Sequence, residues 1–201
     1  FFIIDHQAVW VNGATRLFRH HIPGSKEQLW GIEALVINPF VAPPELCELT
    51  TTAARRLGVT EGPFKIDAIL DKRYGWCILE CATRFSGGWD HMIMAPMVGR
   101  DITSVLLDYA LGLEPHIPPI LPNRYSASYT PYYVPMQKCK WVRVPATKDI
   151  SWQYNIRSPN EILSLKTCAD RPIFFRATGK SPLDAAKNVI ECSKYIVLQE
   201  I

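Results

Sequence analysis

The stretch from Gly62 to Gly88 constrains the fold of this chain more than any other part of the sequence. Residues 64–70 alternate apolar and polar side chains, residues 71–75 have the composition of a tight turn, and residues 76–80 resume a β-rich run. Two alternating runs joined by a short turn are typical of an antiparallel β-hairpin. We therefore expect two neighbouring strands here, followed by a glycine-containing loop.

The pairing of this hairpin decides where two acidic side chains lie. With the turn centred between Lys72 and Gly75, the numbers of paired residues sum to about 147, which places Asp67 opposite Glu80. Opposed carboxylates repel each other unless a proton or a cation lies between them, and hard oxygen ligands suit Mg²⁺. The pattern predicts a metal site at these two residues, although a lone Asp and Glu on a hairpin are usually solvated surface charges.

The residues after Glu80 could hold an anion. Arg84 offers a planar guanidinium group that matches a phosphate or a carboxylate. The glycines in the run Ser86, Gly87 and Gly88 allow close approach of the backbone to a ligand, whereas such a run by itself is usually only a loop. Taken with the carboxylate pair, these residues indicate a metal-nucleotide site for an anionic substrate.

These residues also resemble a known family. Lys-Ile-Asp at residues 65–67, a thirteen-residue step to Glu80, and Glu-Cys-Ala-Thr-Arg-Phe-Ser-Gly-Gly at residues 80–88 are similar to the magnesium-binding end of ATP-grasp ligases. The most similar branch joins carboxylates to amines, as amino-acid ligases do. The sequence departs from the E-x-N-x-R pattern of the family at Ala82, where an asparagine would be a ligand of a second metal ion.

The resemblance implies roles for the site residues. Asp67 and Glu80 would hold Mg²⁺, or Mn²⁺, against the phosphates of ATP, and Arg84 would act near the transferred phosphate and the acyl phosphate. Ser86, Gly87 and Gly88 would lie beside the substrate. Together they imply that a substrate carboxylate is phosphorylated by ATP and then attacked by an amine, which gives an amide, ADP and phosphate.

The resemblance further implies an α+β fold, an antiparallel sheet with packed helices. Residues 1–112 would form the second lobe of an ATP-grasp domain, and residues 113–201 a strand-rich C-terminal subdomain that packs on that lobe. Because the sequence opens at Phe1 in a strand-like run without an initiator methionine, we expect a piece of a longer polypeptide that lacks the N-terminal half. A homodimer is one option for its assembly.

The first residues of the chain are expected to form antiparallel strands. Residues 1–4 and 8–11 are β-rich, and Asn12 and Gly13 have the sequence of a two-residue hairpin turn that would lead into a strand at residues 14–21. In the resembling family, strands of this kind form the floor of the ATP cleft.

A basic side chain on this floor could reach a phosphate of ATP. Arg16 and Arg19 are the candidates, and strand alternation gives them opposite faces, so at most one points into the cleft. We favour Arg19 as a nucleotide-binding residue, with a surface arginine as the alternative for either.

Periodicity and capping residues predict most of the remaining elements. Proline is expected to prevent regular helix across residues 112–136, which we interpret as a connection. The expected helices lie at residues 43–57, at 102–111 with Asp101 as N-cap, and at 182 to about 195 with Ser181 as N-cap. Strands are expected at residues 140–144, 150–156 and 172–178, and residues 34–37 form either a strand or an irregular connection.

Composition excludes several classes of protein. The chain has 201 residues, of which 48% are hydrophobic, enough to bury a core. The net charge of +3 comes from interleaved acidic and basic residues, which does not favour nucleic-acid binding. No apolar run approaches the roughly 20 residues that span a membrane. The six cysteines are scattered, with no C-x-x-C pair, so we expect no zinc site and a cytoplasmic, reduced protein.

Two other functions stay open from sequence. The chain could be a non-catalytic binding module that has kept the lobe and lost the chemistry, which Ala82 favours. It could also belong to an ATP-grasp enzyme of another branch, one that forms a thioester or carboxylates with bicarbonate.

Overall fold

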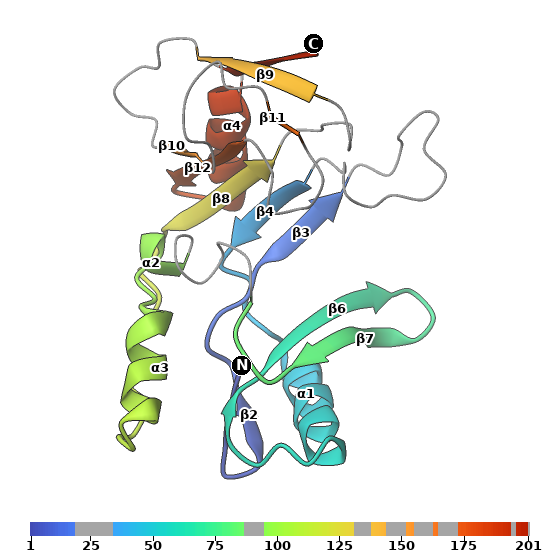
Figure 1. Ribbon diagram of the computed structural model, residues 1–201. Coiled ribbons are helices and arrows are strands. Elements are labelled where there is room, and N and C mark those ends of the chain that lie inside the picture. Colours follow the sequence, from blue (N-terminus) through green and yellow to red (C-terminus); the bar gives the residue numbers. More distant parts are fainter. Residues whose placement is uncertain are drawn as a thin grey trace. The chain divides into compact units, whose positions relative to one another are not determined.

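The computed structural model describes residues 1–18, 34–86, 95–130, 138–143, 152–154, 163–164, 173–193 and 196–200 (Figure 1). The chain forms two compact units that are interleaved in sequence. Unit 1 contains Phe1–Ala14 and Pro39–Leu121, and unit 2 contains Thr15–Asn38 and Pro122–Ile201. This division differs from the sequence boundary expected after residue 112, because residues 34–38 pair with residues 126–130 from the C-terminal part of the chain. The roles expected for residues 1–112 and 113–201 stay predictions.

Unit 1 is built around a small sheet, a helix and a hairpin. Its three-stranded sheet has the order β2-β1-β5, and its two-stranded sheet is β6-β7. The bounds are β1 Phe2–Ile4, β2 Gln7–Val9, α1 Pro44–Arg56, β5 Gly62–Pro63, β6 Lys65–Asp71, β7 Gly75–Ala82, α2 Ala95–Met97 and α3 Ile102–Ala110.

Two clusters of buried side chains hold unit 1 together. In the first, Ile3, Ala54 and Phe64 join β1, α1 and the residue just before β6, and Ile66 and Cys81 of the hairpin pack against them. The second cluster contains Phe2, Val11, Ala95, Ile102 and Val105. One face of the hairpin is therefore fixed to the core of unit 1, beside α1 (Figure 1).

Unit 2 contains a five-stranded antiparallel sheet of order β10-β12-β8-β4-β3 and a three-stranded sheet of order β11-β9-β13. Helix α4 packs against β12 and β8 (Figure 1). The bounds are β3 Thr15–Phe18, β4 Ala34–Asn38, β8 Tyr125–Thr130, β9 Lys138–Arg143, β10 Trp152–Tyr154, β11 Leu163–Ser164, β12 Ile173–Gly179, α4 Pro182–Ser193 and β13 Ile196–Glu200.

The capping residues explain why the helices begin where the sequence predicts. Asp101 accepts a hydrogen bond from the backbone N–H of Ser104 at 3.1 Å, which starts α3. Hydrogen bonds from Ser104 also hold the pKa of the Asp101 carboxyl below its ordinary value. At α4 the Ser181 Oγ accepts from the backbone N–H of Asp184, again at 3.1 Å. The predicted start of α1 is confirmed as well, with Pro44 in its first turn.

The hairpin turn predicted at Asn12 and Gly13 is wrong. The carbonyl oxygen of Gly13 instead accepts from the N–H of Phe40 at 2.7 Å, and β3 pairs with β4 rather than with the preceding strand. A side chain at Gly13 would place its Cβ 2.7 Å from the Phe40 carbonyl oxygen. Glycine at this position therefore allows two backbone segments to approach each other, which is a different use from a turn.

The tight turn lies earlier, between β1 and β2. Ile4 pairs with Gln7, which leaves a two-residue loop of Asp5 and His6 with φ angles of 48° and 62°. Positive φ at both loop residues is the geometry of a type I′ turn, whose twist suits an antiparallel hairpin. Aspartate and histidine are among the non-glycine residues that adopt positive φ most often.

The connection expected across residues 112–136 is wrong for its middle part, because residues 125–130 form β8 in the centre of the five-stranded sheet. Ser126, Ala127 and Ser128 are buried there. No proline falls between residues 123 and 130, so the backbone can pair on both sides with β4 and β12.

In the part of the chain that is described, no helix is long and apolar enough to cross a bilayer.

Candidate functional site

The predicted pairing of the hairpin is confirmed at the acidic residues. Asp67 lies directly opposite Glu80, and Lys65 lies opposite Ala82, in the register expected from the sequence. Between Asp67 and Ala68 the register shifts, since Ala68 pairs with Ile78. One residue of β7 is therefore extra, as in a β-bulge, and bulges change the direction in which neighbouring side chains point.

The two faces of the hairpin have different surroundings. Ile66 and Cys81 pack against the buried cluster around Phe64. Because side chains alternate along a strand, Asp67 and its partner Glu80 project from the opposite face. Their side chains are 39% and 57% exposed. The carboxylates therefore lie on an accessible surface, while the backbone beneath them is anchored in the core.

A lysine side chain connects the two carboxylates. The Lys65 Nζ lies 2.7 Å from Asp67 Oδ2 and 3.0 Å from Glu80 Oε1, and donates a hydrogen bond to each. The Lys65 side chain is only 15% exposed. The cation that two opposed carboxylates require is thus present in this structure, in the form of an ammonium group.

The surroundings of Lys65 change the pKa of its ammonium group. Partial burial by itself lowers the pKa of the ammonium, but the hydrogen bonds and negative charges of Asp67 and Glu80 outweigh burial and raise the pKa above its ordinary value. Lys65 therefore stays charged at neutral pH. Burial also raises the pKa of the nearby Cys81 thiol, with a smaller contribution from Glu80, so Cys81 is a neutral side chain of the core face.

Lys65 is the residue of this site that sequence reasoning missed. The tripeptide Lys-Ile-Asp was part of the resemblance, but the lysine had no role in the expected site. Strand alternation could have indicated a role for Lys65, because residues 65 and 67 lie on the same face of β6.

The other predicted site residues are less completely described. Arg84 is exposed, and its guanidinium donates to the carbonyl oxygen of Phe85 at 2.9 Å. Ser86 is half-buried. Gly87 and Gly88 lie outside the described residues, and so does Arg19, the candidate phosphate ligand of residues 14–21. The alternative, Arg16, is exposed on β3. The substrate and nucleotide roles of these residues stay predictions.

The donor set at the hairpin fits a hard divalent cation. Asp67 and Glu80 offer carboxylate oxygens on one accessible face, and Ala82 adds no side-chain ligand. Among the described residues, no group of three or more histidine, cysteine or acidic side chains is arranged to hold a metal. Two carboxylates suit Mg²⁺, which commonly takes one or two protein ligands and completes its shell with water and phosphate oxygens. Mn²⁺ accepts the same oxygen ligands.

Comparison with known proteins identifies chains of similar structure. No protein-family profile and no curated protein sequence matches this chain. The L-amino acid ligase of Bacillus licheniformis has a TM-score of 0.61 and 20% identity, over 82% of this chain and 45% of the ligase. Phosphoribosylglycinamide synthetase of Anaerococcus prevotii has a TM-score of 0.68 and 13% identity, over 98% of this chain and 51% of the synthetase.

A third protein of similar structure is a carboxylase domain rather than a ligase or synthetase. The biotin carboxylase domain of the 2-oxoglutarate carboxylase of Hydrogenobacter thermophilus has a TM-score of 0.54 and 16% identity, over 85% of this chain and 42% of that domain. This chain spans about half the length of each of these proteins. At such low identity the likeness shows a shared fold.

Proposed function

Since this chain has the fold of the ATP-grasp ligases, we propose that it is part of an ATP-dependent ligase that joins a carboxylate to an amine through an acyl phosphate. The observation that supports this most strongly is that Asp67 and Glu80 lie directly opposite each other, with the Lys65 ammonium between them. They lie on the exposed face of a hairpin whose other face packs on the core of unit 1. Because such an enzyme depends on ATP, the proposal includes a cytoplasmic location.

Each residue of the proposed site has a physical task. Asp67 and Glu80 hold Mg²⁺, which when bound neutralises the charge that develops on the phosphate oxygens. Arg84 orients the acceptor carboxylate and stabilises its phosphorylated form through its paired N–H groups. Ser86 and the glycines that follow it lie beside the substrate, where a backbone without side chains permits close contact.

A second candidate function is carboxylation. The biotin carboxylase domain among the similar structures supports it, because the same fold there belongs to a different ATP-dependent reaction. A module that has lost catalysis is the remaining alternative, since Ala82 supplies no ligand to a second metal ion.

Measurement of ADP release by the full-length protein separates these functions. We expect ADP release only when Mg²⁺ or Mn²⁺, ATP and a carboxylate acceptor from a panel of amino acids are all present. Hydroxylamine in place of the amine should yield a hydroxamate, since it intercepts an acyl phosphate. ADP release that needs bicarbonate and no other acid would favour carboxylation. The absence of ADP release across the panel would favour the non-catalytic module.

A further inference from the structure

Lys65 occupies the position in which a cation is needed between two opposed carboxylates. Its Nζ contacts Asp67 at 2.7 Å and Glu80 at 3.0 Å, and both contacts join charged groups on the same face of the hairpin. The three side chains carry a net charge of −1, which is the sum of two carboxylates and one ammonium. The carboxylate pair is therefore partly neutralised without any metal.

We propose that Lys65 is a built-in counter-ion, which occupies the divalent-cation position in the metal-free protein and leaves it when the metal binds. This inference rests on the proposed function, because it takes Asp67 and Glu80 as the metal ligands. The carboxylate oxygens that accept hydrogen bonds from the ammonium are the same kind of group that a metal ion needs. A divalent cation beside an ammonium held in place would meet strong like-charge repulsion.

The exchange is feasible because both carboxylates that hold the ammonium are partly exposed to solvent. Asp67 and Glu80 are 39% and 57% exposed, and ion pairs with exposed partners contribute little to stability. The lysine side chain has four rotatable bonds, so its ammonium can turn toward solvent while the aliphatic stem stays on the hairpin. Lys65 thus stabilises the empty site and competes with the metal for it.

The Lys65→Met variant tests this competition in the full-length protein, by calorimetric titration with Mg²⁺ in the absence of nucleotide. Methionine keeps an unbranched stem and removes the charge. We expect Mg²⁺ to bind about tenfold more tightly than to the wild type, because the competing cation is gone. The Lys65→Arg variant keeps the charge and should bind Mg²⁺ as the wild type does.

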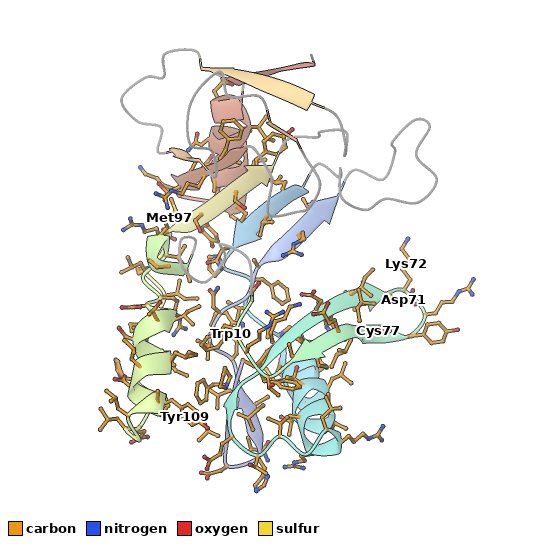
Figure 2. All side chains as sticks on the ribbon, viewed as in Figure 1. Trp10, Asp71, Lys72, Cys77, Met97 and Tyr109 are labelled. Atoms are coloured by element: carbon orange, nitrogen blue, oxygen red, sulfur yellow. The ribbon has the colours of Figure 1, made fainter. Side chains whose placement is uncertain are left out.

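Thermal unfolding gives a second readout that does not depend on activity. Without divalent metal, Lys65→Met should melt about 2–4 °C below the wild type, because two opposed carboxylates are left unneutralised. Saturating Mg²⁺ should restore this loss and raise the melting temperature of the variant by more than it raises that of the wild type. Lys72→Met is the matched control, since Lys72 projects from the tip of the same hairpin (Figure 2) and should change neither measurement.

Mg²⁺ binding by Lys65→Met and by Glu80→Gln distinguishes the counter-ion role from the metal site. Mg²⁺ that binds Lys65→Met no more tightly than the wild type overturns it. If Glu80→Gln then abolishes Mg²⁺ binding in the wild-type background, only the counter-ion role has failed and the proposed metal site stands. If Glu80→Gln leaves Mg²⁺ binding unchanged, the metal site and the counter-ion role both fail. Tighter binding in Lys65→Met that Glu80→Gln reverses supports both.

Discussion

Glu80→Gln in the full-length protein is expected to reduce Mg²⁺-dependent ATP turnover by roughly 10²–10³-fold while leaving the fold intact. Glutamine has nearly the same shape as glutamate but lacks the negative charge that would hold the metal. The Glu80 side chain is 57% exposed and faces away from the buried cluster. The free energy of unfolding should therefore change by no more than about 0.5 kcal/mol. Turnover is measured as ADP release, and stability by denaturant unfolding.

Glu61→Gln is the matched control for this variant. Glu61 is exposed on the segment that leads into β5, and the substitution removes the same charge from the same protein. It should leave turnover within about twofold of the wild type, because no charge at the metal site has changed. Wild-type turnover in Glu80→Gln, or an equal loss in both variants, would contradict the metal-binding role of Glu80.

Phe64→Ala is expected to have the largest effect on stability, a loss of about 3–5 kcal/mol in the free energy of unfolding. Phe64 is completely buried, between Ile3 of β1 and Ala54 of α1. Its backbone N–H also donates to the carbonyl oxygen of Phe1 at 3.1 Å. Removing the ring leaves a cavity at the point where the hairpin joins the core, which denaturant unfolding should detect directly.

Tyr74→Ala provides the comparison for this core substitution. Tyr74 is an aromatic residue of the same hairpin, but the residue is 78% exposed in the turn. Its removal should change the free energy of unfolding by no more than about 0.5 kcal/mol. A loss of less than about 1 kcal/mol in Phe64→Ala would mean that the hairpin does not depend on this buried anchor.

The acidic pair could be predicted from sequence because its geometry is local. Alternating side chains and the turn residues fix the register to within about one residue. Near the turn the observed pairs, such as Asp71 with Gly75, sum to 146 rather than the expected 147, and the shift between Asp67 and Ala68 restores the expected pairing of Asp67 with Glu80. The bulge beside Asp67 could not be foreseen, since an extra residue in β7 changes the register without changing the alternation near the turn. The position of Lys65 between the carboxylates could not be predicted, because strand alternation tells which face a side chain occupies but not how far it lies from its neighbours.

Pairing between strands that are distant in the sequence could not be predicted from local residue patterns. The sheet of unit 2 pairs β4 with β8, although nearly ninety residues separate the two strands in the sequence. Nothing in the sequence around Asn12 and Gly13 shows that the chain passes there from one unit to the other. Tertiary contacts therefore override a dipeptide that favours a turn. The break expected between the β-rich runs at residues 1–4 and 8–11 is, by contrast, a turn at Asp5 and His6.

A crystal structure of the full-length protein with Mg²⁺ and a non-hydrolysable ATP analogue examines the metal site most directly. We expect an ion about 2.0–2.1 Å from a carboxylate oxygen of Asp67 and from one of Glu80, with the Lys65 ammonium withdrawn from between them. A magnesium ion bound to the nucleotide by other side chains, with Lys65 still bridging both carboxylates, would contradict the proposed site.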